Sequence, residues 1–357
     1  MSAPAAKTNL LGLTRAGMEA FVAGMGEKPF RARQLMKWMY RRAVGDFDGM
    51  TDLGKDFRRR LAEIAEISVP EVITSQASAD GTRKWLLRFE SGQAVEMVFI
   101  PEPGRGTLCI SSQVGCAMDC GFCSTGAQGF NRNLTTAEIV GQVWLANREL
   151  GYSPDGDRVI TNVVFMGMGE PLANYGPVWT TVERLHRDLG LSARQITVST
   201  VGVVPGMRRL ATEALPVTLA VSLHAPDDAL RSTLVPLNHR YPIAEVLDAA
   251  AEVAAAKGRR VTFEYAVIHG VNDGLDHAEA LGALLAAWPG VGGAHVNLIP
   301  LNPTTGFSGK APTPARVRAF AERAARPGVT VTVRRNRGVD IDAACGQLRS
   351  RARADAG

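Results

Sequence analysis

The chain has 357 residues, 46% of them hydrophobic and 21% charged, which is enough apolar material for a large core and excludes a disordered tail. No signal-peptide run opens the sequence, and no stretch of about 18 uncharged apolar residues occurs in it, so we expect no membrane span and a cytoplasmic location. The net charge is +5, and residues 1–70 supply most of it, with twelve Lys or Arg against eight Asp or Glu. Such a basic segment suits a polyanionic partner, although an ordinary solvated helix face has the same composition.

Residues 28–44 predict a short helical element near the N-terminus. Phe30, Leu35 and Trp38 recur there at helical spacing, and arginines and lysines fill the positions between them. We therefore expect residues 1–70 to form a compact helical accessory domain with a basic face.

Alternating apolar and polar residues follow Pro70. The segments 71–78, 82–90 and 93–101 have this alternation, and Asp-Gly and Ser-Gly turn pairs separate them. The pattern predicts antiparallel strands joined by tight turns. We assign residues 71–104 to a β-hairpin extension.

From about residue 105, strand-like apolar runs alternate with amphipathic helical stretches. The expected strands cover residues 107–113, 162–167, 195–200, 217–224, 261–268, 294–301 and 329–335. The expected helices cover residues 135–150, 180–189, 206–214, 242–258, 275–288 and 313–326. Because such alternation forms βαβ units, we expect an α/β fold with a parallel sheet. Six helix-linked repeats favour a partial (β/α)6 barrel over residues 105–348, followed by a C-terminal tail at 349–357.

Polar residues follow the carboxyl ends of the expected strands. They lie in the loop that begins at Cys116 and in the segments 167–171 (GMGEP), 199–202 (STVG), 222–226 (SLHAP), 269–273 (HGVND) and 300–303 (PLNP). In parallel barrels the active site is built at this end of the strands. Turn formation would explain the glycines and prolines, but it would not explain Glu170, His224 and Asn302 together.

Cys116, Cys120 and Cys123 have the spacing Cx3Cx2C in the loop after the first barrel strand. Thiolates are soft ligands that suit an iron–sulfur cluster or zinc, but a structural zinc site needs a fourth ligand and the loop contains no histidine. Three ligands leave one iron of a four-iron cluster open to the amine and carboxylate of a bound amino acid. The odd total of five cysteines, with Cys109 and Cys345 outside the motif, argues against a structural disulfide framework.

The Cx3Cx2C loop resembles the signature of the radical S-adenosylmethionine (SAM) superfamily. Residues 107–143 around it (TLCISSQVGCAMDCGFCSTGAQGFNRNLTTAEIVGQV) are similar to one branch, the RlmN/Cfr family of RNA adenine methyltransferases. Further similar segments are VFMGMGEPLANY, ITVSTVGVVPGMRRL, LAVSLHAPDDALRSTLVPLN, VNLIPLNP and RGVDIDAACGQL. The resemblance extends over residues 96–348, and the basic N-terminal domain resembles the RNA-binding accessory domain of the family.

The resemblance implies a 4Fe-4S cluster on Cys116, Cys120 and Cys123, with SAM as the second cofactor. The residues expected to contact SAM are Gly169, Glu170, Ser199, Ser222, Leu223, His224 and Asn302. SAM has an ammonium, a carboxylate and ribose hydroxyls, which require acidic and neutral polar partners of this kind. Glu96 matches the position that the family uses as proton acceptor.

The two outlying cysteines also match family positions. The resemblance implies that Cys345 accepts a methyl group from SAM and delivers it to the base, and that Cys109 resolves the RNA–protein adduct through a transient disulfide. The implied activity is methylation of C2 of adenine 2503 in 23S rRNA and of adenine 37 in tRNA. Methylation of C8 is an alternative, and a non-catalytic iron–sulfur regulator that binds RNA is another.

The implied partners are 23S rRNA and tRNA, together with an electron donor such as flavodoxin. We expect no membrane partner, and we expect the chain to be a monomer. The target adenine would have to leave its stack to reach the reactive groups, at a cost of a few kcal/mol that contacts from the basic domain could offset.

Overall fold

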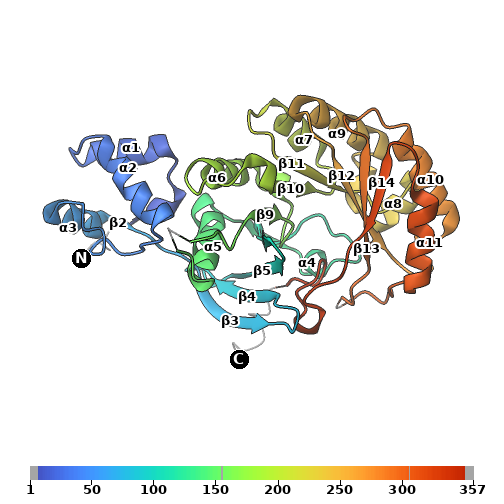
Figure 1. The fold of residues 1–357 in the computed structure, drawn as a ribbon, viewed down its shortest axis with the longest axis horizontal. Coiled ribbons are helices and arrows are strands. Elements are labelled where there is room, and N and C mark those ends of the chain that lie inside the picture. Colours follow the sequence, from blue (N-terminus) through green and yellow to red (C-terminus); the bar gives the residue numbers. More distant parts are fainter. Residues whose placement is uncertain (1–6, 154–155, 305, 350–357) are drawn as a thin grey trace.

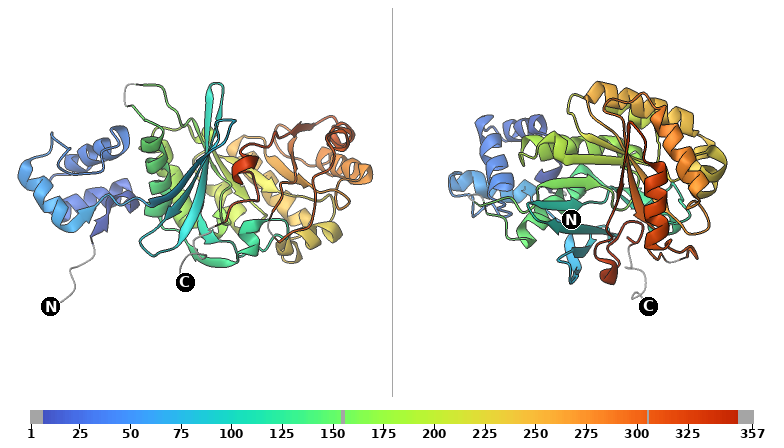
Figure 2. Two further views of the ribbon diagram at one scale, coloured as in Figure 1. Left: turned by 90° about the horizontal axis from the view of Figure 1, so that it is seen from below. Right: turned by 45° about the vertical axis from the view of Figure 1, so that its right-hand side comes forward.

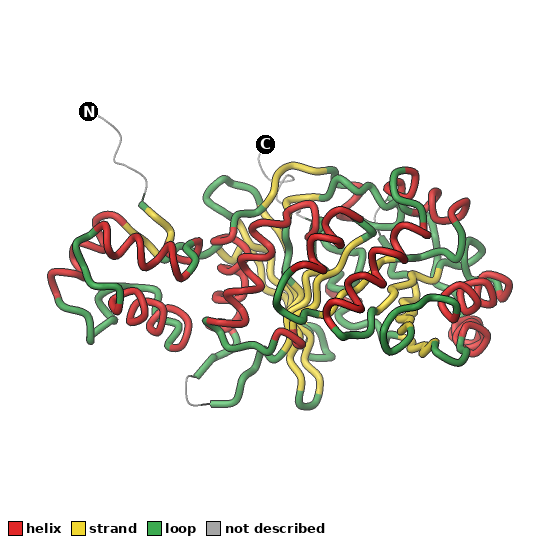
Figure 3. The backbone as a smooth tube through the Cα atoms, turned by 90° about the horizontal axis from the view of Figure 1, so that it is seen from above, coloured by secondary structure: helices red, strands yellow, loops and turns green. Residues whose placement is uncertain are grey.

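The computed structural model describes residues 7–153, 156–304 and 306–349. Residues 350–357, which make up nearly all of the expected C-terminal tail, lie outside this part of the chain. The molecule is elongated, with a group of small helices at the N-terminal end and a larger α/β body beside it (Figures 1 and 3). In the described part, no helix has the length and hydropathy needed to cross a membrane.

The body is built on one sheet of ten strands in the order β14-β13-β12-β11-β10-β9-β6-β5-β4-β3. Neighbouring strands are parallel from β6 to β14, namely β6 (Arg105–Cys109), β9 (Asn162–Phe165), β10 (Ile196–Thr200), β11 (Thr218–Ser222), β12 (Thr262–Val267), β13 (Ala294–Pro300) and β14 (Val329–Val333). Antiparallel pairing then extends the sheet through β5 (Ala94–Glu102), β4 (Arg83–Arg88) and β3 (Glu71–Ala77). The hairpin extension is therefore continuous with the barrel sheet.

Helices connect the parallel strands on the outer side of the sheet (Figures 1 and 2). They are α5 (Thr136–Glu149), α6 (Tyr175–Arg187), α7 (Val204–Thr212), α9 (Ile243–Lys257), α10 (Leu275–Ala286) and α11 (Pro314–Ala324). Because β14 and β3 are the two edges of the sheet, the barrel is open. The partial (β/α)6 barrel that the sequence predicts is confirmed.

Some elements differ from their expected bounds. α6 begins at Tyr175 rather than at residue 180, because Pro177 lies in its first turn, where proline is tolerated. Between β11 and β12 the chain also forms a short helix, α8 (Asp228–Leu234), which the sequence analysis did not predict. Short 3-10 helices are η1 (Leu10–Gly12), η3 (Pro171–Asn174), η4 (Ala193–Gln195), η5 (Pro236–His239) and η6 (Val339–Ile341).

The barrel strands bury one face and leave the other more open. Val198 of β10 and Phe263 of β12 are buried in the main core together with Val246 of α9. Thr197 and Ser199, on either side of Val198, face the concave side of the sheet, where they line cavities. Successive strand residues point to opposite faces, so apolar residues meet the helices and polar residues line the lumen.

The N-terminal helices have a core of their own. The segment contains β1 (Thr8–Asn9), α1 (Arg15–Gly24), α2 (Phe30–Met36), the π-helix η2 (Lys37–Arg41), α3 (Lys55–Ile64) and β2 (Ala65–Glu66), and β1 pairs in parallel with β2. Leu35, Met39 and Phe57 are buried together with Val140 and Trp144 of α5. The Trp144 Nε1–H donates to the Met39 carbonyl at 2.8 Å. One helix of the barrel thus completes the core of the N-terminal helices.

Trp144→Ala should therefore loosen the N-terminal helices. Trp144 is only 3% exposed, and truncation of a buried Trp costs about 3–5 kcal/mol. Limited proteolysis should cut residues 8–67 faster in the variant than in the wild type. Trp179→Ala is the matched control, because Trp179 is half-buried against the main core and does not contribute to the N-terminal one. Equal cleavage rates in both variants would contradict the proposed packing role.

Candidate active site

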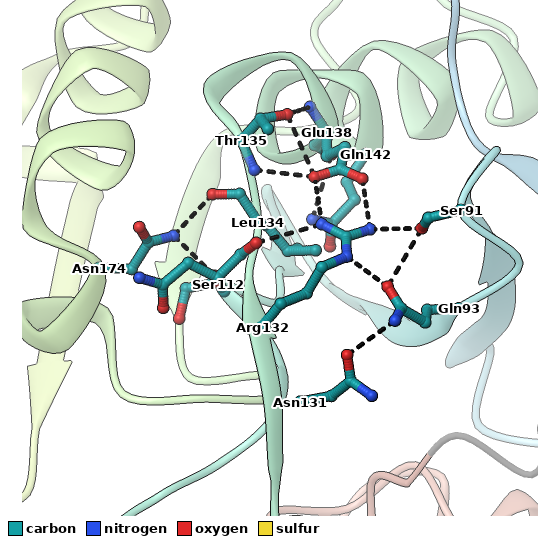
Figure 4. Close-up of polar contacts among 11 residues, drawn as sticks. Ser91, Gln93, Ser112, Asn131, Arg132, Leu134, Thr135, Glu138, Gln142 and Asn174 are labelled. Carbon is teal, nitrogen blue, oxygen red and sulfur yellow. Dashed lines mark hydrogen bonds and ion pairs between the residues drawn. The ribbon is translucent and has the colours of Figure 1, made fainter.

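The cysteine loop is the tip of a two-stranded antiparallel ribbon formed by β7 (Gln113–Gly115) and β8 (Phe130–Asn133). Arg132 of β8 binds both carboxylate oxygens of Glu138, with its Nη1 at 2.8 Å from Oε2 and its Nη2 at 2.7 Å from Oε1. The Glu138 carboxylate also accepts the N–H of Thr135 and so completes the capping box of α5 (Figure 4). This bidentate pair fixes the base of the cysteine loop to the first barrel helix.

Side-chain amides break the expected strand at 107–113 into β6 and β7. Gln142 of α5 exchanges two hydrogen bonds of 2.9 Å with the backbone of Ser111. Asn174 donates from Nδ2 to the carbonyls of Ser112 and Leu134, both at 2.8 Å (Figure 4). These contacts satisfy buried backbone groups that a strand neighbour would otherwise satisfy. The chain can therefore leave the sheet and enter the cysteine loop.

Cys116, Cys120 and Cys123 line one cavity at the carboxyl ends of the barrel strands. Burial raises the pKa of Cys116 to about 12 and the pKa of Cys120 well above its usual value, and the neighbouring thiols add to both shifts. Three thiols gathered at one place suit a soft metal centre, which stabilises their thiolate forms. Among the described residues, no three His, Cys, Asp or Glu side chains are grouped as ligands of one ion. In a cubane cluster each thiolate binds a different iron. The three cysteine sulfurs therefore do not need to converge on one point to hold such a cluster.

Glu170 lies in the same cavity. Its carboxylate accepts the N–H groups of Leu172 and Val201, each at 2.9 Å, and burial raises its pKa to about 7. A buried carboxylate of this kind can bind an ammonium group. Gly169 before it has a φ of +98°, and a Cβ there would lie 2.5 Å from Cβ of Gln113, so only glycine fits.

His224 also lines the cavity, in the left-handed conformation with a φ of +62°. Its Nδ1 accepts the Ala266 N–H at 3.0 Å, which leaves the proton on Nε2. Burial lowers its pKa to about 3, so the ring is neutral and Nε2–H is a hydrogen-bond donor. Asn272 of the HGVND segment does not line the cavity, but its Nδ2 donates to the His224 carbonyl at 2.9 Å. Backbone strain at a non-glycine residue with this support is typical of ligand sites.

Three other expected SAM contacts also line the cavity, and one does not. Ser199, Ser222 and Asn302 are on its wall. Asn302 donates from Nδ2 to the Cys345 carbonyl at 3.1 Å, and its buried Oδ1 has no hydrogen-bond partner among the described residues. That oxygen can accept a hydrogen bond from a ligand. Leu223 is fully buried away from the cavity, and its carbonyl accepts the Arg231 guanidinium at 3.0 Å.

Cys345 lines this cavity and also an adjoining one, which Cys109 lines as well. Both are free thiols. Burial raises the pKa of Cys109 to about 12, with Cys345 contributing in the same direction and Arg334 in the opposite one. Arg334 and Glu264 line the first cavity too, and the sequence analysis did not single them out. In the sequence, each is a charged residue within an expected strand. Whether such a residue points into the lumen can be read only once the strand register is known.

The segment around Cys345 is held by hydrogen bonds from Ser124 and Thr125, which follow the third cysteine of the loop. The Ser124 N–H donates to the Gly346 carbonyl at 2.8 Å, and the Thr125 hydroxyl donates to the Leu348 carbonyl at 2.6 Å. The cluster loop therefore fixes the segment that contains Cys345 from one side.

A buried ion pair holds the same segment from the other side. Lys84 of β4 and Glu96 of β5 lie 3.0 Å apart, and each side chain is 6% exposed. The Lys84 ammonium donates to the Asp342 carbonyl at 3.2 Å, and Glu96 accepts the Arg349 N–H at 2.9 Å. Glu96 does not line either cavity that contains Cys345. The pair contacts both ends of the segment, and in Figure 1 this segment (dark red) passes beside the end of β4.

Family models match both parts of the chain. One, described as the radical SAM superfamily, matches residues 110–281, and another, described as the ribosomal RNA large subunit methyltransferase N-terminal domain, matches residues 8–67. The open barrel and the three thiols beside its strand ends, together with the first match, define a radical SAM enzyme, which uses SAM and a 4Fe-4S cluster.

Relatives with known names identify the branch of this superfamily. The chain is 50% identical over 352 residues to the dual-specificity RNA methyltransferase RlmN of Marinobacter nauticus, covering 98% of this chain and 94% of that protein. It is 52% identical over 360 residues to the protein of the same name from Stenotrophomonas maltophilia, covering 98% and 90%. The crystal structure of a radical SAM methyltransferase from Sphaerobacter thermophilus superimposes with a TM-score of 0.90 at 46% identity, covering 96% of this chain and 99% of that one. The chain belongs to the RlmN family.

Lys84→Met tests whether the ion pair positions the Cys345 segment. Removal of one partner of a buried pair costs on the order of 3 kcal/mol, whereas apolar replacement of both is often neutral. We expect Lys84→Met to lower the melting temperature and the hydrogen-exchange protection of residues 342–349. Lys84→Met with Glu96→Met should regain stability but not this protection. Unchanged protection in both variants would show that other contacts hold the segment.

Proposed function

We propose that this protein methylates C2 of adenine 2503 in 23S rRNA and C2 of adenine 37 in tRNA. The observation that supports this best is that Cys345 lines one cavity with the three thiols and a second with Cys109. A non-catalytic regulator has no use for such a pair of cysteines. The relatives named dual-specificity RNA methyltransferase support RNA as the substrate and favour this activity over C8 methylation.

The residues present suit the two cofactors. Cys116, Cys120 and Cys123 would hold the cluster, and Glu170, His224 and Asn302 offer an acidic acceptor, a neutral donor and an amide oxygen to SAM. When bound, the cluster supplies the electron that cleaves SAM to a 5′-deoxyadenosyl radical. Cys345 accepts on its sulfur a methyl group from one SAM molecule. The 5′-deoxyadenosyl radical from a second SAM takes a hydrogen atom from that methyl group and becomes 5′-deoxyadenosine. The remaining carbon radical, still attached to the Cys345 sulfur, adds to the ring carbon of the base.

The remaining steps use Glu96 and Cys109. The adduct radical loses one electron, which the oxidised cluster would accept, and the proton of the ring carbon. We propose Glu96 as the acceptor of this proton because it matches the family position; its carboxylate pairs with Lys84 outside both cavities that contain Cys345, so it must leave that pair to reach the base. Cys109 attacks the Cys345 sulfur, and the bond between that sulfur and the transferred carbon breaks. The carbon keeps the bonding electron pair and takes the proton of the Cys109 thiol, so the RNA is released with a methyl group. A disulfide between the two cysteines remains for cellular thiols to reduce. Because burial raises the pKa of Cys109 to about 12, the thiol stays protonated at neutral pH until this step.

The N-terminal helices offer a basic surface for the RNA. Arg15, Arg33, Lys37 and Arg41 line one hollow there together with Arg187 of α6. Cations gathered in this way bind phosphates. Asp188 also lines this hollow, Arg15 pairs with Glu19 at 3.6 Å and Arg187 pairs with Glu183 at 3.4 Å. Arg33, Lys37 and Arg41 are therefore its cations without an ion pair in the described part of the chain. Outside the hollow, Arg31 is paired with Glu27 at 3.8 Å, and the Arg42 guanidinium lies 4.1 Å from the centre of the Trp38 ring. We propose that the enzyme acts as a monomer and receives its electrons from a carrier such as flavodoxin.

Mapping of the methyl group tests the proposed reaction. Reconstituted protein incubated with SAM, reductant and a 23S rRNA fragment should yield 2-methyladenosine at position 2503, and a tRNA substrate should yield it at position 37. Nucleoside mass spectrometry against synthetic 2-methyl and 8-methyl standards gives the position. Cys345→Ala is the control and should give no methylated RNA. Exclusive 8-methyladenosine, or product from the control, would contradict the proposal.

Cys109→Ala should stop the reaction after the carbon–carbon bond has formed. The variant should purify with RNA attached covalently through Cys345, because the group that releases the adduct is missing. A denaturing gel with and without nuclease shows the adduct, and mass spectrometry of the peptide that contains Cys345 locates it. Normal turnover without an adduct would return Cys109 to the status of an inert buried cysteine.

A further inference from the structure

A large cavity lies at the opposite end of the barrel lumen from the three thiols. Its volume is about 750 Å³, which is in the range of ligand pockets. It is lined by the amino-terminal halves of the barrel strands, since Asn162, Thr197, Thr218, Thr262 and His295 stand at or next to the first residues of β9 to β13. The side chains at these five positions are polar.

Polarity at these positions is unusual for a closed barrel. A full eightfold barrel fills its interior with bulky aliphatic side chains. Here the corresponding inward positions hold hydroxyl, amide and imidazole groups, and the outward neighbours Val163, Leu219 and Phe263 are buried in the main core. The helix-facing side of these strands is thus apolar, whereas their lumen-facing positions at the amino-terminal end are polar.

The rim of this cavity is strongly cationic. Its lining includes two carboxylates, Glu102 and Glu264, and six arginines: Arg105, Arg194, Arg259, Arg334, Arg335 and Arg337. Within the described part of the chain, Arg337 is the one of these six with a carboxylate within 4 Å, namely Asp80 at 3.9 Å. Unpaired cations around one concave surface raise the local concentration of anions.

Arg194 and Arg259 form the most definite anion-binding element of the rim. Arg259 donates from Nη2 to the Thr218 hydroxyl at 3.0 Å, while its buried Nε has no hydrogen-bond partner among the described residues. The same hydroxyl lies 3.4 Å from the Arg194 carbonyl, so the two residues flank Thr218. Burial and the charge of Arg194 both lower the pKa of Arg259. An anion between the two guanidinium groups would satisfy the free N–H and relieve the repulsion.

The cavity adjoins the reaction site. Met166, Glu264 and Arg334 line both this cavity and the one with the three thiols. Met166 and Arg334 also line the cavity shared by Cys109 and Cys345. Met166, Glu264 and Arg334 therefore form the wall that a group bound at the rim would have to pass to reach Cys345.

We propose that the RNA enters the lumen from this end, with phosphates beside the target nucleotide bound by Arg194 and Arg259. This inference rests on the proposed RNA methyltransferase activity and adds the route of the substrate. The flipped adenine passes between Glu264 and Arg334 and reaches Cys345 from the amino-terminal end of the barrel strands. SAM lies on the other side of the base, at the carboxyl ends of the strands. An extruded nucleotide with its flanking phosphates is an anionic, elongated ligand that suits a cationic lumen.

The double variant Arg194→Gln, Arg259→Gln tests this route. Its matched control is Arg316→Gln, Arg323→Gln, which removes the same charge from two exposed arginines of α11 that have no ion pair in the described part of the chain. The affinity of each full-length protein for a tRNA anticodon stem-loop is measured by fluorescence anisotropy at several salt concentrations. Melting temperatures show whether both variants fold.

The lumen variant should bind RNA at least fivefold more weakly at low salt. Its plot of log K against log salt should be shallower by roughly 0.7 for each lost phosphate contact, because fewer counterions are released. The control should match the wild type in affinity, in slope and in RNA methylation. Inorganic phosphate should compete at millimolar concentration with the wild type and less with the lumen variant.

Two outcomes separate this inference from the proposed function. If the wild type binds and methylates RNA, but the lumen variant and the α11 control have the same affinity and salt slope, the route is wrong and the activity stands. If the wild type binds RNA through Arg194 and Arg259 without methylating it, the lumen is an RNA site and the proposed activity fails.

Discussion

The alternation of side chains along β9 to β14 is the constraint on which the site depends. Successive residues of a strand point to opposite faces, so a single register decides both the core and the lumen. A slip of one residue in β10 would turn Val198 into the lumen and Ser199 into the helix layer. The burial of the apolar set against the helices therefore fixes where every polar lumen residue points. The packing of these apolar side chains against the helices therefore determines both the stability of the fold and the geometry of the site.

The Cys345 segment depends on this frame in a different way, because it has little regular structure of its own. It follows β14, at one edge of the sheet, and runs back to β4 and β5 on the other side of β6. This path brings residue 345 beside residue 109, which is at the end of β6. A buried ion pair such as Lys84–Glu96 contributes little net stability because desolvation offsets the attraction. Its directional contacts with the segment give it a positioning role that an apolar pair could not fill.

The sequence could predict the elements with regular periodicity and not those fixed by distant partners. The barrel strands, their helices and the location of Glu170, His224 and Asn302 at one end follow from alternation and from the parallel topology. The break between β6 and β7 could not be predicted, because it depends on the side chains of Gln142 and Asn174 from two separate helical segments. Leu223 was expected at the SAM site from its neighbours in the motif, but strand alternation directs its side chain into the core.

Of the two basic regions of the molecule, one can be predicted from the sequence and the other cannot. The surplus of cations in residues 1–70 is visible as a run in the sequence and predicts a basic surface. The arginines of the lumen rim come from separate segments, since Arg105 begins β6, Arg194 lies in η4, Arg259 follows α9 and Arg335 follows β14. Arg105 and Arg194 are isolated in the sequence, and they lie far along the chain from the pair at 259–260 and the short run at 334–337, so counting along the chain does not show that these arginines share one opening. Only the curvature of the sheet brings them to one opening, so the barrel body has a cationic rim although its own net charge is close to zero.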